Sequence, residues 1–369
     1  MQQDIESFFL SIATPGVQGL HPYQPGKPLA ELEREYGISN AIKLASNENP
    51  LGPSPAIKGV IEQTIAELAR YPDGNGFALK NRLVQDLDVA QSSITLGNGS
   101  SDIIEFAIRA FASRGDEVVF SQFSFAMYPI LTQMVGAKGI VVPATDWGHD
   151  LSVMLACISD NTKLVFIANP NNPTGTWLKT ADIEAFLKEV PKQVIVIVDE
   201  AYFEYVQEAD YTTTIALIDR FPNLIVTRTF SKAYGLAGLR IGYGVSHPAI
   251  ADILNRVRPP FNTNSMALVA AEVSLNDVAH RQQSVDLNRR GMQQLEAGFR
   301  SLDLEFIPSV GNFIAVNVKR KDTEIFEKLL RLGVIVRPVG NYEMHNMIRV
   351  TVGLEAENSR FLDALGQVL

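Results

Sequence analysis

The sequence is poor in cysteine and in basic residues. Only one of its 369 residues is a cysteine, Cys157, which excludes an intrachain disulfide framework and fits a reducing compartment. Lysine and arginine total 32 against 41 aspartates and glutamates, so the formal net charge is −9. Nucleic acids and anionic membranes are bound by basic surfaces, and neither is expected as a partner. Small anionic ligands are not excluded, since a few local arginines suffice to bind them.

Long hydrophobic runs are also lacking. No segment approaches the roughly 20 apolar residues of a membrane-spanning helix. The N-terminal stretch MQQDIESFFLSIATPG has acids where a secretory signal carries lysine or arginine. With 46% hydrophobic and 20% charged residues, the composition resembles that of globular enzymes. We therefore expect a soluble, cytoplasmic protein.

The residues that are present predict an α/β fold. The first fifty or so are rich in proline, glycine and asparagine, which predicts an arm and a loop rather than a packed unit. Over residues 97–246, helical patterns alternate with β-branched runs such as KLVFIA and VIVIVD. Strands that are apolar on both faces and alternate with helices are typical of a mostly parallel sheet covered by helices on both sides.

A second, smaller α/β pattern follows a long helical stretch at about 264–302. There FIAVNV, VIVRPV and MIRVTV are separated by the helix TEIFEKLLRLG and followed by a C-terminal helix. The chain is long enough for two domains. We predict an N-terminal arm that joins the small domain (1–49), a large domain (50–260), and a linking helix with the small C-terminal domain (261–369).

Asp199 stands at the end of the apolar run VIVIVD. In open α/β sheets, ligands bind beyond the carboxyl ends of the strands. One interpretation is that Asp199 caps the helix that follows. The other is that it pairs with a ligand cation, because a buried carboxylate needs one, and a protonated pyridine nitrogen would serve.

Lys232 follows the strand pattern LIVTRTF, within TFSKAYGLAGLR. A lysine among small and hydroxyl-bearing residues, here Thr229 and Ser231, is suited to Schiff-base chemistry. Arg240 follows eight residues later and could reach a phosphate. The alternative is that Lys232 is a solvated surface lysine. Its neighbours Thr229, Ser231 and Arg240 make this interpretation less favoured.

Two further motifs fall at the same predicted sheet edge. GNGSSD (97–102) begins the helix pattern IIEFAIRAFAS, entered at a Ser/Asp cap, and its amides with the hydroxyls of Ser100 and Ser101 predict a phosphate site. A plain helix cap is the alternative. A dinucleotide-binding GxGxxG is rejected, because Asp102 replaces its last glycine and no strong strand precedes it. NPNNPTG (169–175) follows KLVFIA, where an asparagine amide could donate to an anionic ring oxygen.

These motifs, in this order, resemble the fold-type-I pyridoxal-phosphate (PLP) aminotransferases. Within that class, the histidinol-phosphate aminotransferases have segments similar to HPYQPGK, LASNENPLGP, YPDGNG and VIVRPVGNYEMHNMIRVTVG. The resemblance covers nearly the whole chain. It implies the fold of that class, PLP as the cofactor, no metal, and a homodimer with shared active sites.

The resemblance also implies roles for the matching residues. Lys232 would form the Schiff base and move a proton between the substrate Cα and the cofactor C4′. Asp199 would pair with the pyridinium nitrogen, and Asn172 and Tyr202 would bind the ring oxygen. The phosphate would be held by Ser100, Ser101, Ser231 and Arg240, with Thr229 close by.

The expected substrate contacts lie at both ends of the chain. Arg349 would clamp a substrate carboxylate, and Asn47 is a further substrate-binding candidate. Tyr23 and Arg337 would bind the substrate phosphate, although Arg337 could instead be a surface or interface arginine. Tyr71 would reach the phosphate of the neighbouring subunit's cofactor.

Two positions depart from the family pattern. Phe125, in SFAMY, stands where many relatives stack a tyrosine on the cofactor ring, so that stacking is expected without the hydroxyl. The phosphate loop reads GSSD rather than GSDE or GSND, which leaves a contact from the Ser101 side chain in question but not one from its amide.

The implied reaction converts L-histidinol phosphate and 2-oxoglutarate to imidazole-acetol phosphate and L-glutamate by a ping-pong route, a step of histidine biosynthesis. An aromatic amino-acid aminotransferase is an alternative, since imidazole and phenyl pockets differ by few contacts. Threonine-phosphate decarboxylase is another. A non-catalytic PLP-binding regulatory domain is less favoured, because no DNA-binding module is appended.

Overall fold

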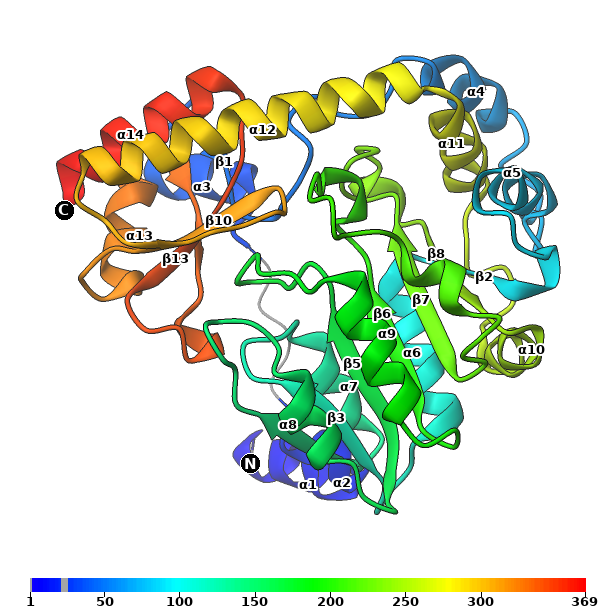
Figure 1. Cartoon of the computed structure of the whole chain (residues 1–369). Coiled ribbons are helices and arrows are strands. Elements are labelled where there is room, and N and C mark those ends of the chain that lie inside the picture. Colours follow the sequence, from blue (N-terminus) through cyan, green and yellow to red (C-terminus); the bar gives the residue numbers. More distant parts are fainter. Residues whose placement is uncertain (1, 21–25) are drawn as a thin grey trace.

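The computed structural model describes residues 2–20 and 26–369, and its largest sheet has seven strands in the order β2-β8-β7-β6-β5-β3-β4 (Figure 1). Strands β3 to β7 pair in parallel, whereas β8 runs antiparallel to both neighbours. The predicted mostly parallel α/β fold is confirmed. The strands are β2 (Ile94–Gly97), β3 (Glu117–Ser121), β4 (Lys138–Val142), β5 (Thr162–Ala168), β6 (Ile195–Asp199), β7 (Leu224–Thr229) and β8 (Gly242–Ser246).

Strand β2 corrects one statement made from the sequence. It is fully buried and directly precedes GNGSSD, so a strand does stand before that motif. Its four residues, ITLG, are too few to give a clear strand pattern. Among the described residues, β2 pairs only with the antiparallel β8, so it forms no parallel strand–helix–strand unit there, and a dinucleotide fingerprint stays excluded.

The central strands are apolar throughout because both of their faces are covered. In β5, Leu164 and Phe166 pack on one side, while Val165 and Ile167 pack on the other, as the two-residue period of a strand requires. One side is covered by α6 (Ser100–Phe111), α7 (Met127–Met134) and α10 (Pro248–Val257). The other is covered by α4 (Ile57–Ile65), α5 (Phe77–Leu87), α8 (Leu151–Ala156), α9 (Thr180–Glu189) and α11 (Ser265–Asn276).

A second core is built on the antiparallel sheet β12-β13-β10-β9 and contains residues from both ends of the chain. Leu44 packs there beside Phe361, and β1 (Ile42–Lys43) pairs in parallel with β11 (Val334–Ile335). The other elements are β9 (Phe306–Ile307), β10 (Phe313–Asn317), β12 (Arg337–Pro338), β13 (Met347–Thr351), α12 (Val278–Ser301), α13 (Asp322–Arg331) and α14 (Glu355–Val368). The domain boundaries given above stay predictions.

The N-terminal region contains more helix than its proline and glycine content suggested. It forms α1 (Gln2–Ile12), α2 (Pro15–Gln18) and α3 (Leu29–Tyr36), where only an arm and a loop were expected. Leu32 of α3 is buried against Leu330 and Ile335, which explains its stability. Figure 1 shows α12 crossing the top of the molecule, from the helices beside the large sheet to the small sheet.

Candidate active site

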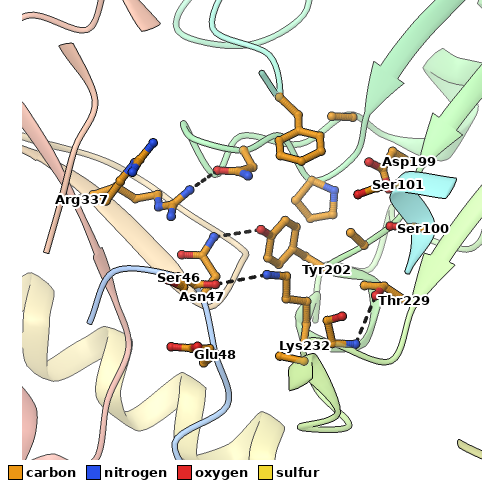
Figure 2. A pocket seen from close by; sticks show the side chains of 18 of the residues that line it. Ser46, Asn47, Glu48, Ser100, Ser101, Asp199, Tyr202, Thr229, Lys232 and Arg337 are labelled. Carbon is orange, nitrogen blue, oxygen red and sulfur yellow. Dashed lines mark hydrogen bonds between the residues drawn. The ribbon is translucent and has the colours of Figure 1, made fainter. Parts of the chain in front are cut away.

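A cavity of about 280 Å³ lies between the carboxyl edge of the large sheet and the small sheet. It collects most of the residues singled out from the sequence. In Figure 2, Asp199 and Ser100 lie on one side of the pocket, Arg337 lies on the other, and Lys232 and Tyr202 lie between them. The predicted residues that line it are Asn47, Ser100, Ser101, Phe125, Asn172, Asp199, Tyr202, Thr229, Ser231, Lys232, Arg240, Arg337 and Arg349.

Asp199, the last residue of β6, is held by side chains from two neighbouring elements. Thr227 Oγ1 donates to its Oδ1 at 2.9 Å, and Tyr128 Oη donates to its Oδ2 at 3.0 Å. Burial raises the pKa of the Asp199 carboxyl, while these two hydrogen bonds act to lower it. No α-helix follows directly, only the short turn Phe203–Tyr205, so the carboxylate is not simply a helix cap.

Thr227 and Tyr128 were missed in the sequence, although each carries a weak signal. Thr227 alternates with Thr229 in VTRT, which places both on the same face of β7. Tyr128 lies in SFAMY, three residues after Phe125. The sequence could not indicate that its hydroxyl reaches across to β6.

Lys232 lies just beyond β7, and its Nζ donates to the carbonyl oxygen of Ser46 at 3.3 Å (Figure 2). Burial lowers the pKa of the Lys232 amine to about 8. The positive charge of Arg349 acts in the same direction, and Glu48 opposes it. A much larger fraction of this amine than of an ordinary lysine is therefore neutral and nucleophilic near neutral pH.

The N-terminus of α6 forms a cradle for an anion. Gly99, with φ of 90°, precedes the helix, and a Cβ atom there would lie 2.3 Å from Arg240 Nη2. Only glycine therefore allows Arg240 this close to the helix start. Arg240 Nη1 donates to Ser231 Oγ at 3.2 Å, which joins two of the four predicted phosphate ligands.

The expected Ser/Asp cap of this helix is wrong. Gly99 occupies the N-cap position, and no side chain caps the helix. Asp102 instead accepts a hydrogen bond from the Asn98 amide at 2.8 Å and another from Asn262 Nδ2 at 2.9 Å. The side chain of Asp102 thus fixes the loop, and the amides of the first helical turn stay available to a ligand.

Hydrogen bonds from the segment after β1 and from β13 orient two residues that follow strands of the large sheet. Asn47 Nδ2 donates to Tyr202 Oη at 2.8 Å, and Arg349 Nη1 donates to Asn172 Oδ1 at 2.5 Å. Since Oδ1 of Asn172 accepts, Nδ2 is the end that can donate to a ligand. Burial raises the pKa of the Tyr202 hydroxyl to about 12, so it stays protonated and can donate as well.

Arg337 and Arg349 are direct partners in the antiparallel pairing of β12 with β13, and both line the cavity. Residues directly opposite on such a pair project from the same face of the sheet. Two cations therefore stand together on the small-sheet side of the pocket. Tyr342, which the sequence did not single out, lines the same region.

One predicted site residue, Tyr71, is not among the described residues that line the pocket. Tyr71 is 82% exposed, and its ring stacks on Phe261 with centroids 4.7 Å apart. Tyr23 lies outside the described residues. Phe125 does line the pocket, and it contacts Tyr128 edge-on with ring centroids 5.8 Å apart.

The residues of the pocket fit PLP. The α6 cradle with Arg240 suits a phosphate, the doubly hydrogen-bonded Asp199 suits a protonated ring nitrogen, and Lys232 suits an aldehyde. Within residues 2–20 and 26–369, no group of three or more His, Cys, Asp or Glu side chains could hold a metal ion. In the same part of the chain, no helix has both the length and the apolar character needed to span a membrane.

Comparison with known proteins establishes the family to which the chain belongs. The model of aminotransferase class I and II matches residues 39–365. This chain belongs to that family. The aminotransferase is 57% identical over 364 residues to histidinol-phosphate aminotransferase 1 of Nitrosococcus oceani, covering 99% of this chain and 98% of the relative. Histidinol-phosphate aminotransferase 2 of Pseudomonas fluorescens is 58% identical over 363 residues, covering 98% of each chain.

Solved structures agree on the fold of this aminotransferase. Histidinol-phosphate aminotransferase from Sinorhizobium meliloti, solved in complex with pyridoxal-5′-phosphate, superposes with a TM-score of 0.89 at 29% identity, covering 97% of each chain. L-threonine-O-3-phosphate decarboxylase from Porphyromonas gingivalis superposes with a TM-score of 0.78 at 22% identity, covering 88% of this chain and 98% of that one. The second likeness concerns the fold alone.

Proposed function

We propose that this aminotransferase uses PLP to convert L-histidinol phosphate and 2-oxoglutarate to imidazole-acetol phosphate and L-glutamate, in histidine biosynthesis. The observation that carries the proposal is the pair Arg337 and Arg349, opposite each other at the pocket. Two adjacent guanidinium groups suit a substrate whose anion is a phosphate. The high identity to relatives named for this activity supports the same reading.

The bound cofactor supplies a ring that withdraws the electron pair released at the substrate Cα. Lys232 would be the base that takes the Cα proton on Nζ and returns it to the cofactor C4′, on the other side of the substrate nitrogen. Its pKa of about 8 suits both directions of that transfer near neutral pH. Asp199 provides the anion that keeps the ring nitrogen protonated, and its burial beside two donors fixes its position.

The residues on the opposite edge of the ring would act as donors. Asn172 Nδ2 and Tyr202 Oη would bind the ring oxygen, each oriented by a partner, Arg349 and Asn47 respectively. Arg349 would therefore contact both Asn172, which is proposed to bind the ring oxygen, and the substrate anion. A substrate that fills the pocket would also displace water from it, which would strengthen these interactions.

The two half-reactions bring different anions to the same cations. Histidinol phosphate has no α-carboxylate, whereas glutamate and 2-oxoglutarate have two carboxylates each. Arg349 and Arg337 can accept either, because a guanidinium group forms paired hydrogen bonds with carboxylate and with phosphate alike. Tyr23 is proposed as a further phosphate ligand on sequence grounds.

We further propose a homodimer in which Tyr71 reaches the neighbouring subunit's cofactor phosphate. An aromatic residue that is 82% exposed and stacked on another exposed ring suits a surface that a second copy would cover. Other exposed apolar side chains occur nearby in sequence, namely Ile65, Leu68 and Phe77. A biosynthetic enzyme of this kind would act in the cytoplasm.

A panel of amino donors in single-turnover half-reactions tests the substrate. Histidinol phosphate should convert the enzyme-bound PLP to its amino form with a higher second-order rate constant than phenylalanine or tyrosine. Preference for phenylalanine would favour an aromatic aminotransferase. Release of CO₂ from threonine phosphate would favour the decarboxylase, and bound PLP that reacts with no donor would favour a regulatory domain.

A further inference from the structure

Tyr128 connects the wall of the pocket to the carboxylate at its base. It lies in the first turn of α7 and is completely buried, and its ring stacks on Phe166 of β5 with centroids 4.5 Å apart and planes 8° apart. Its hydroxyl donates to Asp199 Oδ2 at 3.0 Å. If this position only had to fill the core, phenylalanine would serve as well, because it has no buried hydroxyl that needs a hydrogen-bond partner.

The surroundings of Asp199 make this hydroxyl important. The carboxylate is 6% exposed, and its other oxygen accepts from Thr227 of β7. The charged and titratable groups that act on Asp199 or respond to it include Tyr128, Glu200, Tyr202, Tyr211 and Lys232. Glu200, next on the chain, disfavours a second negative charge, so the anion depends on its hydrogen-bond donors.

The hydroxyl of Tyr128 is well suited to donate. Burial raises the pKa of Tyr128 well above its ordinary value, and the negative charge of Asp199 raises it further, so the proton stays on the tyrosine. Stacking on Phe166 fixes the ring of Tyr128 and therefore the position of its Oη. Phe125 contacts Tyr128 edge-on, so the segment that provides one wall of the pocket also provides a second side-chain donor to Asp199.

We propose that Tyr128 is a positioning residue for the cofactor, whose hydroxyl holds Asp199 as an anion directed at the ring nitrogen. Tyr128 acts through Asp199, since it is not among the residues that line the cavity. The proposal rests on the PLP role given to Asp199 in the proposed function. It does not depend on which amino donor is used.

The test is the affinity of the full-length apoprotein for PLP, measured by equilibrium dialysis from pH 5 to pH 8. The variants are Tyr128→Phe and Asp199→Ala, alone and combined. Tyr243→Phe is the matched control, because Tyr243 is a buried tyrosine that packs on the opposite face of the sheet. Thr227→Val removes the other side-chain donor to Asp199, while the backbone amide of Ala201 stays, and gives an independent check if Tyr128→Phe folds poorly.

At pH 7, Tyr128→Phe should raise the Kd for PLP about tenfold, since a hydrogen bond to a charged group contributes at least this much. The Asp199 anion is present above its pKa and is lost as the pH falls through it. Without the Tyr128 donor, that loss should begin at higher pH than in the wild type. In the Asp199→Ala background, Tyr128→Phe should change the Kd less than twofold.

An equal loss of affinity in both backgrounds would show a merely structural role and overturn the proposal. An unchanged Kd and pH profile for both Tyr128→Phe and Thr227→Val would overturn it too. A wrong substrate assignment would leave these affinities as they are. Failure of the wild-type apoprotein to bind PLP would overturn the proposed function together with this inference.

Discussion

Arg337 and Arg349 face each other across β12 and β13, twelve residues apart in the chain and directly opposite in register. Like charges in such a position destabilise a strand pair by repulsion. We therefore expect this pair of arginines to bind an anionic ligand rather than to stabilise the small sheet. Arg349 also donates to Asn172, a proposed ligand of the cofactor ring oxygen. Loss of Arg349 should therefore disturb the cofactor site as well as the binding of the substrate anion.

Arg337→Ala should lower kcat/KM for histidinol phosphate about 10- to 100-fold, because a charge-assisted hydrogen bond contributes roughly 1.5–3 kcal/mol. A non-phosphorylated aromatic donor should lose less. Steady-state kinetics with both donors measure the difference. Arg331→Ala is the control, since Arg331 is an exposed arginine at the end of α13. Equal losses for both donors would show that Arg337 does not bind the phosphate and would favour an aromatic aminotransferase.

Lys232→Ala should abolish turnover, because no other residue is proposed to bond the cofactor aldehyde or to move the Cα proton. PLP should still bind through the α6 cradle and Asp199. Absorbance spectra should show bound cofactor without the band of a lysine-linked form. Turnover by this variant without added amine would contradict the whole assignment.

The capture of PLP by the apoprotein should depend on pH with a midpoint of about 8, the lowered pKa of Lys232. The neutral amine attacks, so the rate should rise as the pH increases through this value and should fall below it. Glu48→Gln should move the midpoint downward, because Glu48 raises the pKa of Lys232. Stopped-flow absorbance after mixing measures the rate. A midpoint near 10.5, the ordinary value for lysine, would contradict the predicted burial effect.

Asp199→Ala should fold but should transaminate several orders of magnitude more slowly, because the ring nitrogen loses the anion that keeps it protonated. Single-turnover rates with saturating PLP isolate this effect from cofactor loss, and circular dichroism checks the fold. A decrease of less than about tenfold, which is about 1.4 kcal/mol, would mean that Asp199 is mainly structural.

Tyr71 should act across a subunit boundary. Mixing Tyr71→Ala subunits with Lys232→Ala subunits should produce heterodimers in which one site carries both lesions and the other has neither. The mixture should then be active, although each of the two variant homodimers alone is poorly active or inactive. Heterodimers that form but stay at the parental level would show that Tyr71 serves its own subunit.

The residues with chemical roles could be predicted where each stands at the end of a strand pattern that the sequence itself shows. Lys232 and Asp199 each follow an apolar strand run, and parallel strands bring such ends to one edge. Tyr128 was not predictable, since its hydroxyl meets Asp199 only through the packing of α7 on the sheet. The pairing of β1 with β11 is also non-local, and nothing in the short segment Ile42–Lys43 specifies its partner. The N-terminal helices were obscured by prolines and glycines that lie between them.

The pairing of Ile42 with Val334 has a consequence for how the molecule is made. The segment that follows β1 supplies the Ser46 carbonyl to Lys232 and the Asn47 amide to Tyr202. This segment leaves the ribosome long before the strand that holds it, because β11 begins 292 residues (334 − 42) further along the chain. The large sheet can begin to assemble during synthesis, but its reactive lysine obtains these neighbours only after Val334 and Ile335 have been made. Synthesis of β11, rather than growth of the large core, therefore sets the earliest moment at which the pocket becomes competent.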